Sequence, residues 1–363
     1  MRIFGSPFRY VQGAGIIEHI SDILAPLGDN FLLVVDRMVL DPIGNQISVS
    51  LHQSHMHCIL IPFGGECSNS EISRIIKKVH NEPLSGIVGV GGGKTADTAK
   101  VLSIRLDVPV AIVPTLASND APTSHFAVVY DENHSYDHLE MMKLSPWYVV
   151  VDTDVIVKAP ARFFIAGIGD AMATKFEADA CAASKAHNYF EGQVTQTALA
   201  MANLSWEIVK NKAVDAMDAV HSGDVNQAFE DVVEATILLS GLGFENGGLA
   251  AAHAVSSGFT VLNQTKGALH GEMVAFGLLV QFILEERPQL FMNEMLAFYK
   301  EIGLPSTLAE LGIDCPIPEL LAPVIETICA PDSTAKNMPF NVSPEMVERA
   351  ILKANDLGMA RSV

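Results

Sequence analysis

The distribution of apolar residues divides the chain into two parts of different character. In the first part, short apolar runs alternate with amphipathic segments, one of which opens with the capping-box pattern Ser68-Asn69-Ser70-Glu71. The runs that predict buried strands are 31–36, 58–62, 86–90, 108–113 and 147–151. Strands that alternate with helices predict a parallel sheet covered by helices on both faces.

After residue 158 the pattern changes to long helical segments rich in alanine, leucine and methionine. These segments are 170–183, 195–220, 225–241, 248–258 and 270–286. Few runs in this part resemble strands, and 363 residues is long for a single core. We therefore expect two domains, an α/β domain over residues 1–158 and an all-α domain over residues 159–363.

The composition excludes several classes of protein. Half of the residues are apolar and 18% are charged, which predicts large cores rather than disorder. The net charge of −19 disfavours a nucleic-acid partner, because phosphates repel an acidic surface. The five cysteines form no CxxC pair, which is typical of scattered thiols in a reducing compartment. The N-terminus lacks a signal-peptide pattern, and the apolar run 274–284 is about half the length that spans a bilayer. We expect a cytoplasmic protein without a membrane partner.

A glycine cluster, Gly89-Val90-Gly91-Gly92-Gly93-Lys94-Thr95, follows the third predicted strand and precedes a helical pattern. It is not a nucleoside-triphosphate loop, because Val88 stands where the first glycine of that motif belongs. It is not a GxGxxG fingerprint either, because Lys94 occupies the position of the last glycine. Glycines let backbone amides approach a ligand, and a helix N-terminus favours a pyrophosphate. The spacing fits a phosphate site and an ordinary tight turn equally well.

Two other polar features follow predicted strands. Asp36 ends the first apolar run, where a carboxylate either binds an adenosine ribose or simply closes the strand. The segment 114–124 is rich in hydroxyl groups and carries Asp120. Such a segment either lines a polar cleft or forms a plain turn.

Three potential metal ligands lie in the second part of the chain. Asp170 follows two glycines and is expected to open a helix, where it either points into a cleft or caps the helix. His253 lies in a helix of very small side chains, and His270 opens the next predicted helix. One carboxylate and two imidazoles leave a coordination position open, as in catalytic metal sites. Each histidine alone is also compatible with a hydrogen-bonded core residue, and spacing alone does not bring Asp170 beside them.

Five strings of residues together resemble the glycerol dehydrogenases of the iron-type alcohol dehydrogenase superfamily. The strings are 89–100, 120–122, 166–171, 247–255 and 270–277. They occur in the family order, and the likeness extends over nearly the whole chain. The resemblance implies an NAD-binding α/β domain, a helical domain in a dehydroquinate synthase-like architecture, and a zinc ion in the cleft between them.

The resemblance also implies roles for individual residues. Asp170, His253 and His270 would bind Zn²⁺, and Asp120 would contact a small polyol. The residues that would bind NAD are Asp36, Gly93, Lys94, Thr95, Ala96, Asp97, Thr115, Ser118, Ser124, Phe126 and Tyr130. The implied reaction is NAD-dependent oxidation of a secondary hydroxyl, foremost glycerol to dihydroxyacetone. The implied assembly is a homo-oligomer, often an octamer.

Several positions depart from the family pattern. Thr174 stands where iron-dependent members place a histidine, which leaves three protein ligands and suits zinc without excluding iron or manganese. Ser256, Asn119 and Lys336 replace a histidine, a threonine and a histidine that are usual in the family. These changes bear on glycerol as the substrate more than on the reaction.

Alternative functions therefore stay open. They are a superfamily oxidoreductase for another diol or for a hydroxy or oxo acid, a dehydroquinate-synthase-like lyase, and an NAD-sensing protein that has lost catalysis. The acid at Asp120 suits hydroxyl groups better than the carboxylate and phosphate of a lyase substrate.

Overall fold

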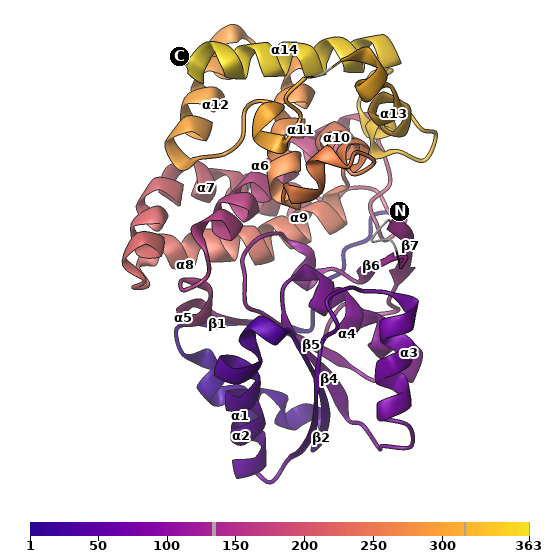
Figure 1. Ribbon diagram of the computed structural model, residues 1–363, viewed down its shortest axis with the longest axis vertical. Helices are drawn as coiled ribbons and strands as arrows, with labels where there is room; N and C mark the ends of the chain where they lie inside the picture. Colours follow the sequence, from indigo (N-terminus) through magenta and orange to yellow (C-terminus); the bar gives the residue numbers. More distant parts are fainter. Residues whose placement is uncertain (133–135, 316, 363) are drawn as a thin grey trace.

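The computed structural model describes residues 1–132, 136–315 and 317–362. An α/β region at the N-terminal end and a helical region at the C-terminal end are stacked on one another (Figure 1). The strands are β1 Arg9–Gly13, β2 Asn30–Val35, β3 His57–Pro62, β4 Gly86–Gly91, β5 Val110–Pro114, β6 Phe126–Tyr130, β7 Tyr136–Met141 and β8 Tyr148–Asp152.

The main sheet has the strand order β1-β8-β5-β4-β2-β3, and neighbouring strands are parallel. From β2 the chain continues to β3 on one side, and it then crosses back to β4 on the other side. The order of the strands therefore reverses between β2 and β4, where Val35 is in register with Val90. In open α/β sheets, ligands bind at the carboxyl ends of the strands next to such a switch point.

Helices cover both faces of the sheet, as the sequence predicts. They are α1 Ile20–Leu24, α2 Asn45–Gln53, α3 Asn69–Lys78, α4 Gly93–Leu106 and α5 Thr153–Ile156. Side chains alternate along β2, so that Phe31 and Leu33 pack in one core cluster with α1 and α2, while Leu32 and Val34 pack in another with α3 and α4. The hairpin β6–β7 is antiparallel and lies apart from the main sheet.

The C-terminal region is helical, as predicted. Its helices are α6 Ala161–Ser184, α7 Gln196–Ser222, α8 Gln227–Glu234, α9 Ser240–Gly247, α10 Ala251–Phe259, α11 His270–Leu284, α12 Gln289–Ile302, α13 Pro318–Ile328 and α14 Pro344–Ser362. Short 3-10 or π turns complete the chain: η1 Ile16–His19, η2 Ala25–Leu27, η3 Arg37–Val39, η4 Leu40–Gly44, η5 Ala121–Thr123, η6 Ala235–Leu239, η7 Gln264–Gly267, η8 Ala309–Leu311 and η9 Thr334–Asn337. Within the described ranges, no helix has the length and apolar character needed to cross a membrane.

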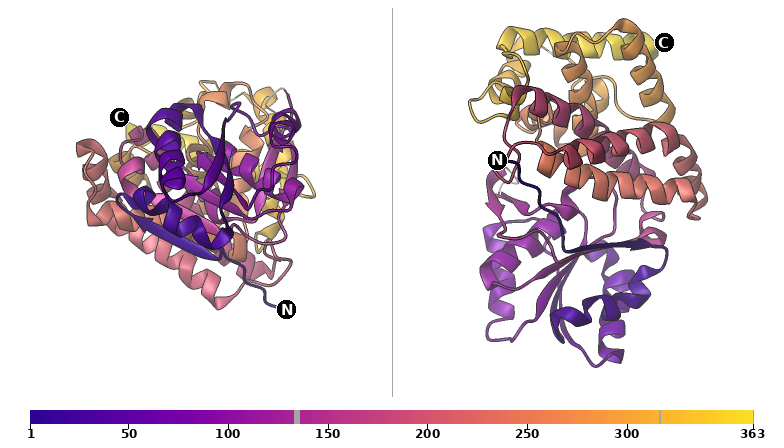
Figure 2. Two further views of the ribbon diagram at one scale, coloured as in Figure 1. Left: turned by 90° about the horizontal axis from the view of Figure 1, so that it is seen from below. Right: turned by 180° about the vertical axis from the view of Figure 1, so that it is seen from behind.

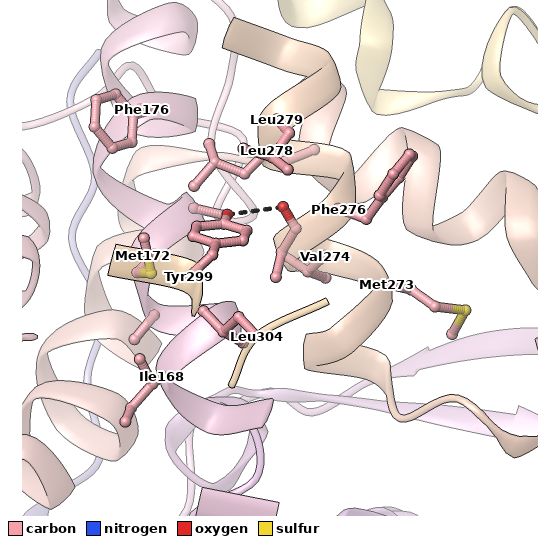
Figure 3. Packing of buried hydrophobic residues seen from close by; sticks show 14 of the residues in the cluster. Ile168, Met172, Phe176, Met273, Val274, Phe276, Leu278, Leu279, Tyr299 and Leu304 are labelled. Atoms are coloured by element: carbon pink, nitrogen blue, oxygen red, sulfur yellow. Dashed lines mark hydrogen bonds between the residues drawn. The ribbon is translucent and has the colours of Figure 1, made fainter. Parts of the chain in front are cut away.

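The core of the helical region lies around the crossing of α6 and α11 (Figure 3). Met172 and Phe176 of α6 belong to one buried cluster with Leu278 of α11 and Tyr299 of α12. The Tyr299 hydroxyl is fully buried and donates to the Ala275 carbonyl oxygen at 2.8 Å. This core fixes the position of α11 relative to α6.

One local expectation is wrong. Asp170 does not open a helix, because α6 begins at Ala161 and Asp170 lies well inside it. The two glycines before Asp170 serve close packing instead of a turn. A Cβ at Gly167 would lie 1.9 Å from the Ala117 carbonyl oxygen, and a Cβ at Gly169 would lie 2.6 Å from the Gly271 carbonyl oxygen. A helix cap at Asp170 is therefore excluded.

The first residues of the chain connect the two regions. The N-terminus lies beside the helical region before the chain enters β1 at the edge of the sheet (Figure 2). The Asn246 side chain of α9 accepts from the Gly5 amide at 2.7 Å and donates to the Gly5 carbonyl at 2.9 Å. The Gln193 amide donates to the Met1 carbonyl oxygen at 2.8 Å. These bonds hold the N-terminal segment against the helices.

Candidate active site

The structure brings the three predicted metal ligands together. Asp170 on α6, His253 on α10 and His270 at the start of α11 offer ligand atoms that all lie within 4.8 Å of one another. The Nε2 atoms of His253 and His270 lie 3.3 Å and 3.4 Å from the same oxygen, Asp170 Oδ1. Tertiary packing thus supplies the contact that sequence spacing leaves open.

These separations suit a tetrahedral cation. Zinc bonds of about 2.0–2.2 Å place neighbouring ligand atoms roughly 3.4 Å apart in a tetrahedron. Asp170 Oδ1 is buried and has no hydrogen-bond partner among the described residues, whereas Oδ2 accepts from the Asp120 amide at 3.2 Å. A buried carboxylate oxygen without a partner is costly unless a ligand satisfies it. The donor set and its spacing therefore fit a bound zinc ion.

Burial and charge act in opposite directions at this site. Burial raises the pKa of Asp170, but the nearby His270 and His253 rings outweigh it and hold the pKa of that carboxyl well below its usual range. Burial lowers the pKa of His253, but the carboxylates of Glu177 and Asp170 raise it well above the usual histidine value. The site therefore favours a negative Asp170 and stabilises positive charge beside it.

Asp120 lies next to the three ligands in the loop after β5. Its side chain is buried, and the Ser240 hydroxyl donates to its Oδ2 at 2.7 Å. Ser240 also forms a 2.6 Å hydrogen bond with the Thr174 hydroxyl. Burial, together with the charge of Asp170, raises the pKa of Asp120 well above its usual value. Thr174 lies one helical turn after Asp170 on α6. Its hydroxyl group is therefore linked to the Asp120 carboxylate through hydrogen bonds of Ser240.

The candidate cofactor residues meet at the switch point between β2 and β4. Asp36 follows β2 and accepts from the Met38 amide at 2.9 Å as the N-cap of η3. A Cβ added to Gly91, whose φ is +155°, would lie 2.9 Å from Asp36 Cβ and 2.7 Å from Thr95 Oγ1. Thr95 Oγ1 is buried and has no hydrogen-bond partner among the described residues. The close packing requires glycine at position 91 and brings Asp36 beside the start of α4.

The N-terminus of α4 is suited to an anion. Gly92 is its N-cap and contributes no side-chain hydrogen bond, while its carbonyl oxygen accepts from the Thr95 amide at 3.1 Å. The Gly93 and Lys94 amides at the start of this 14-residue helix therefore remain available. Lys94 is about half exposed and pairs with Glu66 at 2.7 Å, while its Nζ lies 5.2 Å from the Tyr130 ring centroid. The glycine cradle and the orphaned Thr95 hydroxyl fit a dinucleotide pyrophosphate.

Other predicted cofactor residues are engaged within the protein. The Asp97 carboxylate accepts from the Val128 amide at 3.2 Å. The Ser124 hydroxyl is buried, accepts from Lys100 Nζ at 3.0 Å and donates to the Ala121 carbonyl at 2.9 Å. Among the remaining positions, Ala96 and Thr115 are buried, Gly93 and Ser118 are partly exposed, and Phe126 packs against Tyr189 and Phe244. Their contacts with a cofactor stay predictions.

Sequence reasoning missed several residues that shape the site. Lys100 is completely buried and donates to Ala121 O at 2.7 Å, which holds the loop that carries Asp120. Burial lowers the pKa of Lys100. Glu177 is completely buried and contacts His253. Glu177 lies two helical turns after Asp170 on α6, and this spacing in the sequence could have indicated that the two carboxylates share one face of the helix. Nothing in the sequence indicates the partners of Ser240 or Lys100.

Known proteins resemble this chain over most of its length. Residues 7–153 match the family described as iron-containing alcohol dehydrogenase. A glycerol dehydrogenase from Pseudomonas putida is 43% identical over 357 residues, which cover 98% of each chain. The chain belongs to the iron-containing alcohol dehydrogenase family.

Relatives named for different activities resemble the chain. A glycolaldehyde reductase from Halobacterium salinarum is 40% identical and covers 98% of each chain. The crystal structure of glycerol dehydrogenase from Schizosaccharomyces pombe superposes with a TM-score of 0.96 at 36% identity, covering 99% of this chain and 92% of that one. The family and the fold expected from the sequence are thus confirmed.

Proposed function

We propose that this alcohol dehydrogenase oxidises a secondary hydroxyl of a small polyol, foremost glycerol to dihydroxyacetone, with NAD as the oxidant and one zinc ion. The observation that carries the proposal is the orphaned Asp170 Oδ1, which lies 3.3 Å and 3.4 Å from two histidine nitrogens. When bound, zinc supplies a Lewis acid that acidifies the substrate hydroxyl, and NAD supplies the hydride acceptor.

The protein's own residues would bind and orient these groups. Asp170, His253 and His270 hold the cation, while Asp36 binds the adenosine ribose and disfavours a 2′-phosphate. Gly93 to Asp97 face the pyrophosphate at the start of α4, and the predicted contacts from Thr115 to Tyr130 complete the cofactor site. In this proposal the N-terminal 158 residues form the NAD domain, and the active site lies in a cleft between the two domains.

Asp120 supports a neutral polyol as the substrate. Its carboxyl is buried beside Asp170, which raises its pKa and favours hydrogen bonding to a hydroxyl over contact with an anion. A hydroxy acid or a phosphorylated substrate would add negative charge at this position. We also propose that the enzyme is cytoplasmic and forms a homo-oligomer, as the family resemblance implies.

A second candidate activity is the reduction of glycolaldehyde with NADH. The observation that favours it is the 40% identity to the Halobacterium salinarum glycolaldehyde reductase over 98% of each chain. Ser256 is buried on the His253 helix, where the resemblance to glycerol dehydrogenases implies a histidine. Comparing kcat/KM for glycerol, dihydroxyacetone and glycolaldehyde distinguishes the two candidates.

The primary experiment measures NADH formation with glycerol in three samples: untreated enzyme, chelator-stripped enzyme, and stripped enzyme restored with zinc. Activity that disappears on stripping and returns with zinc supports the proposal. Activity that survives complete removal of metal contradicts it.

The variant Asp170→Asn tests the ligand assignment directly. It should lose turnover and zinc binding but retain its fold, measured by circular dichroism, and its NADH binding, measured by NADH fluorescence. Full activity of this variant would refute the ligand assignment.

A further inference from the structure

Glu177 of α6 connects the metal-ligand helix α6 with the metal-ligand helix α10. Its carboxylate is completely buried, and Oε1 accepts from the Ala250 amide at 2.8 Å and from the His253 amide at 2.9 Å. The other oxygen, Oε2, lies 2.5 Å from Nδ1 of the His253 ring. One side chain thus contacts both the backbone and the ring of a single ligand residue.

The backbone contacts make Glu177 the cap of α10. Ala250, the N-cap residue of this helix, has no side chain that accepts a hydrogen bond. The Ala252 amide donates to Gln281 Oε1 at 3.0 Å, and the Ala250 and His253 amides donate to Glu177. A carboxylate at a helix N-terminus is also stabilised by the helix dipole. Glu177 is therefore held in one orientation by two backbone amides of α10 as well as by the His253 ring.

This orientation determines the tautomer of His253. Oε1 of Glu177 accepts from both backbone amides, and Oε2 of the same carboxylate has no proton to donate, so Nδ1 of His253 must carry a proton to bond with Oε2. In the neutral ring the lone pair then lies on Nε2, the atom that is 3.3 Å from Asp170 Oδ1. The His270 side chain is 47% exposed, and its ring forms no comparable contact with a second carboxylate among the described residues.

We propose that Glu177 is a positioning residue for the metal site, which sets the tautomer and the ring orientation of His253 so that Nε2 faces the cation. The inference rests on the proposed zinc function of Asp170, His253 and His270. Carboxylates that accept from a metal-bound histidine contribute about 10- to 100-fold to metal affinity. Glu177 contributes to binding through His253 and does not itself bind the cation.

The variant Glu177→Gln tests the acceptor chemistry without changing the size of the side chain. If its amide nitrogen faces His253, it donates to Nδ1 and moves the proton to Nε2, where the proton blocks metal binding. If its amide oxygen faces His253, its NH₂ group opposes the donating backbone amides of α10. Either arrangement weakens the site, and we expect a zinc affinity about 10- to 100-fold below that of the wild type.

Glu245→Gln is the matched control. Glu245 is also completely buried. Its Oε1 accepts from the His125 backbone amide at 2.5 Å and also contacts Nδ1 of the His125 ring. His125 is not one of the three ligands, so this variant should lose stability while its zinc affinity stays at the wild-type value. A second variant, Glu177→Asp, keeps the charge and the acceptor but is one methylene shorter. We expect its zinc affinity to lie between those of the wild type and Glu177→Gln.

Zinc affinity is measured on the full-length apoenzyme by competition with a chromophoric chelator. The visible bands of the cobalt-substituted enzyme report the ligand geometry, and NADH binding and circular dichroism report the fold. The proposal is supported by the affinity order wild type, Glu177→Asp, Glu177→Gln, together with altered cobalt bands in the last variant.

Three outcomes would overturn the proposal. The first is equal zinc affinity for wild type and Glu177→Gln while the wild type keeps zinc-dependent activity, which removes this inference and leaves the proposed function intact. The second is an equal loss of affinity in Glu245→Gln, which indicates a general effect on stability. The third is a wild-type enzyme that binds no zinc, which removes the proposed function as well.

Discussion

The contact between α6 and α11 sets the distance between Asp170 and His270, and Gly271 is the residue that permits this contact. A Cβ added at Gly271 would lie 1.9 Å from the Ala166 carbonyl oxygen. Real Cβ atoms essentially never approach a neighbour within 3.0 Å, so Gly271→Ala must separate the two backbones locally by at least 1.1 Å, the difference between these distances. The clash lies beside His270 and on the helix of Asp170.

A displacement of this size exceeds the tolerance of a metal site. Ligand distances in a metal site are held within about 0.2 Å, so His270 cannot keep its bond length to a cation shared with Asp170 unless the site rearranges. We expect Gly271→Ala to weaken zinc binding by at least about tenfold and to lower kcat/KM by up to about 100-fold. The overpacked helix crossing should also lower the free energy of unfolding by about 1–3 kcal/mol.

The assay compares zinc affinity, kcat/KM for glycerol and thermal unfolding with those of a matched variant, Gly267→Ala. A Cβ at Gly267 meets no atom within 4 Å, although this residue lies only four positions earlier. Gly267→Ala should therefore match the wild type in all three measurements. Wild-type zinc affinity in folded Gly271→Ala would refute the reasoning that this helix contact sets the ligand geometry.

Three further predictions follow from the structure. Tyr299→Phe removes the buried bond to Ala275 O and should lower the free energy of urea unfolding by about 1 kcal/mol, with little change in KM; an unchanged midpoint would contradict it. Burial raises the pKa of Glu71, but the hydrogen bonds from Arg74 outweigh it and hold that pKa below its usual range. This stabilisation is complete above the unfolded-state pKa and is lost as the pH falls through the folded-state pKa, so Glu71→Gln should be about 1 kcal/mol less stable at pH 7 and approach the wild type below about pH 4. A pH-independent difference would count against this assignment. Asp36→Ala should weaken NAD binding and reduce the preference for NAD over NADP, measured from the two dissociation constants; an unchanged ratio would exclude Asp36 from the ribose site.

The apolar runs of the sequence predict none of the strands β1, β6 and β7, and β1 and β7 show why a local pattern is not enough. β1 is short and of mixed polarity, with the sequence Arg-Tyr-Val-Gln-Gly, because it lies at the edge of the sheet. β7 contains Asp137, His138 and Glu140, and only its pairing with β6 makes it a strand. Propensity and periodicity describe a segment by itself, whereas these strands depend on partners elsewhere in the chain.

The sequence by itself determined the fold class, because apolar runs and helical periodicity record which faces of each segment are buried. It also indicated a metal site and a phosphate site. Asp170, His253 and His270 are polar residues within segments of small apolar side chains, and the glycine cluster lies between a predicted strand and a predicted helix. Only the tertiary structure decided that Asp170 Oδ1 faces both histidines, that Glu177 holds His253, and that Asp36 lies beside Gly91. These contacts join residues that are distant in sequence, and their distances are set by helix crossings and strand order that no local pattern specifies.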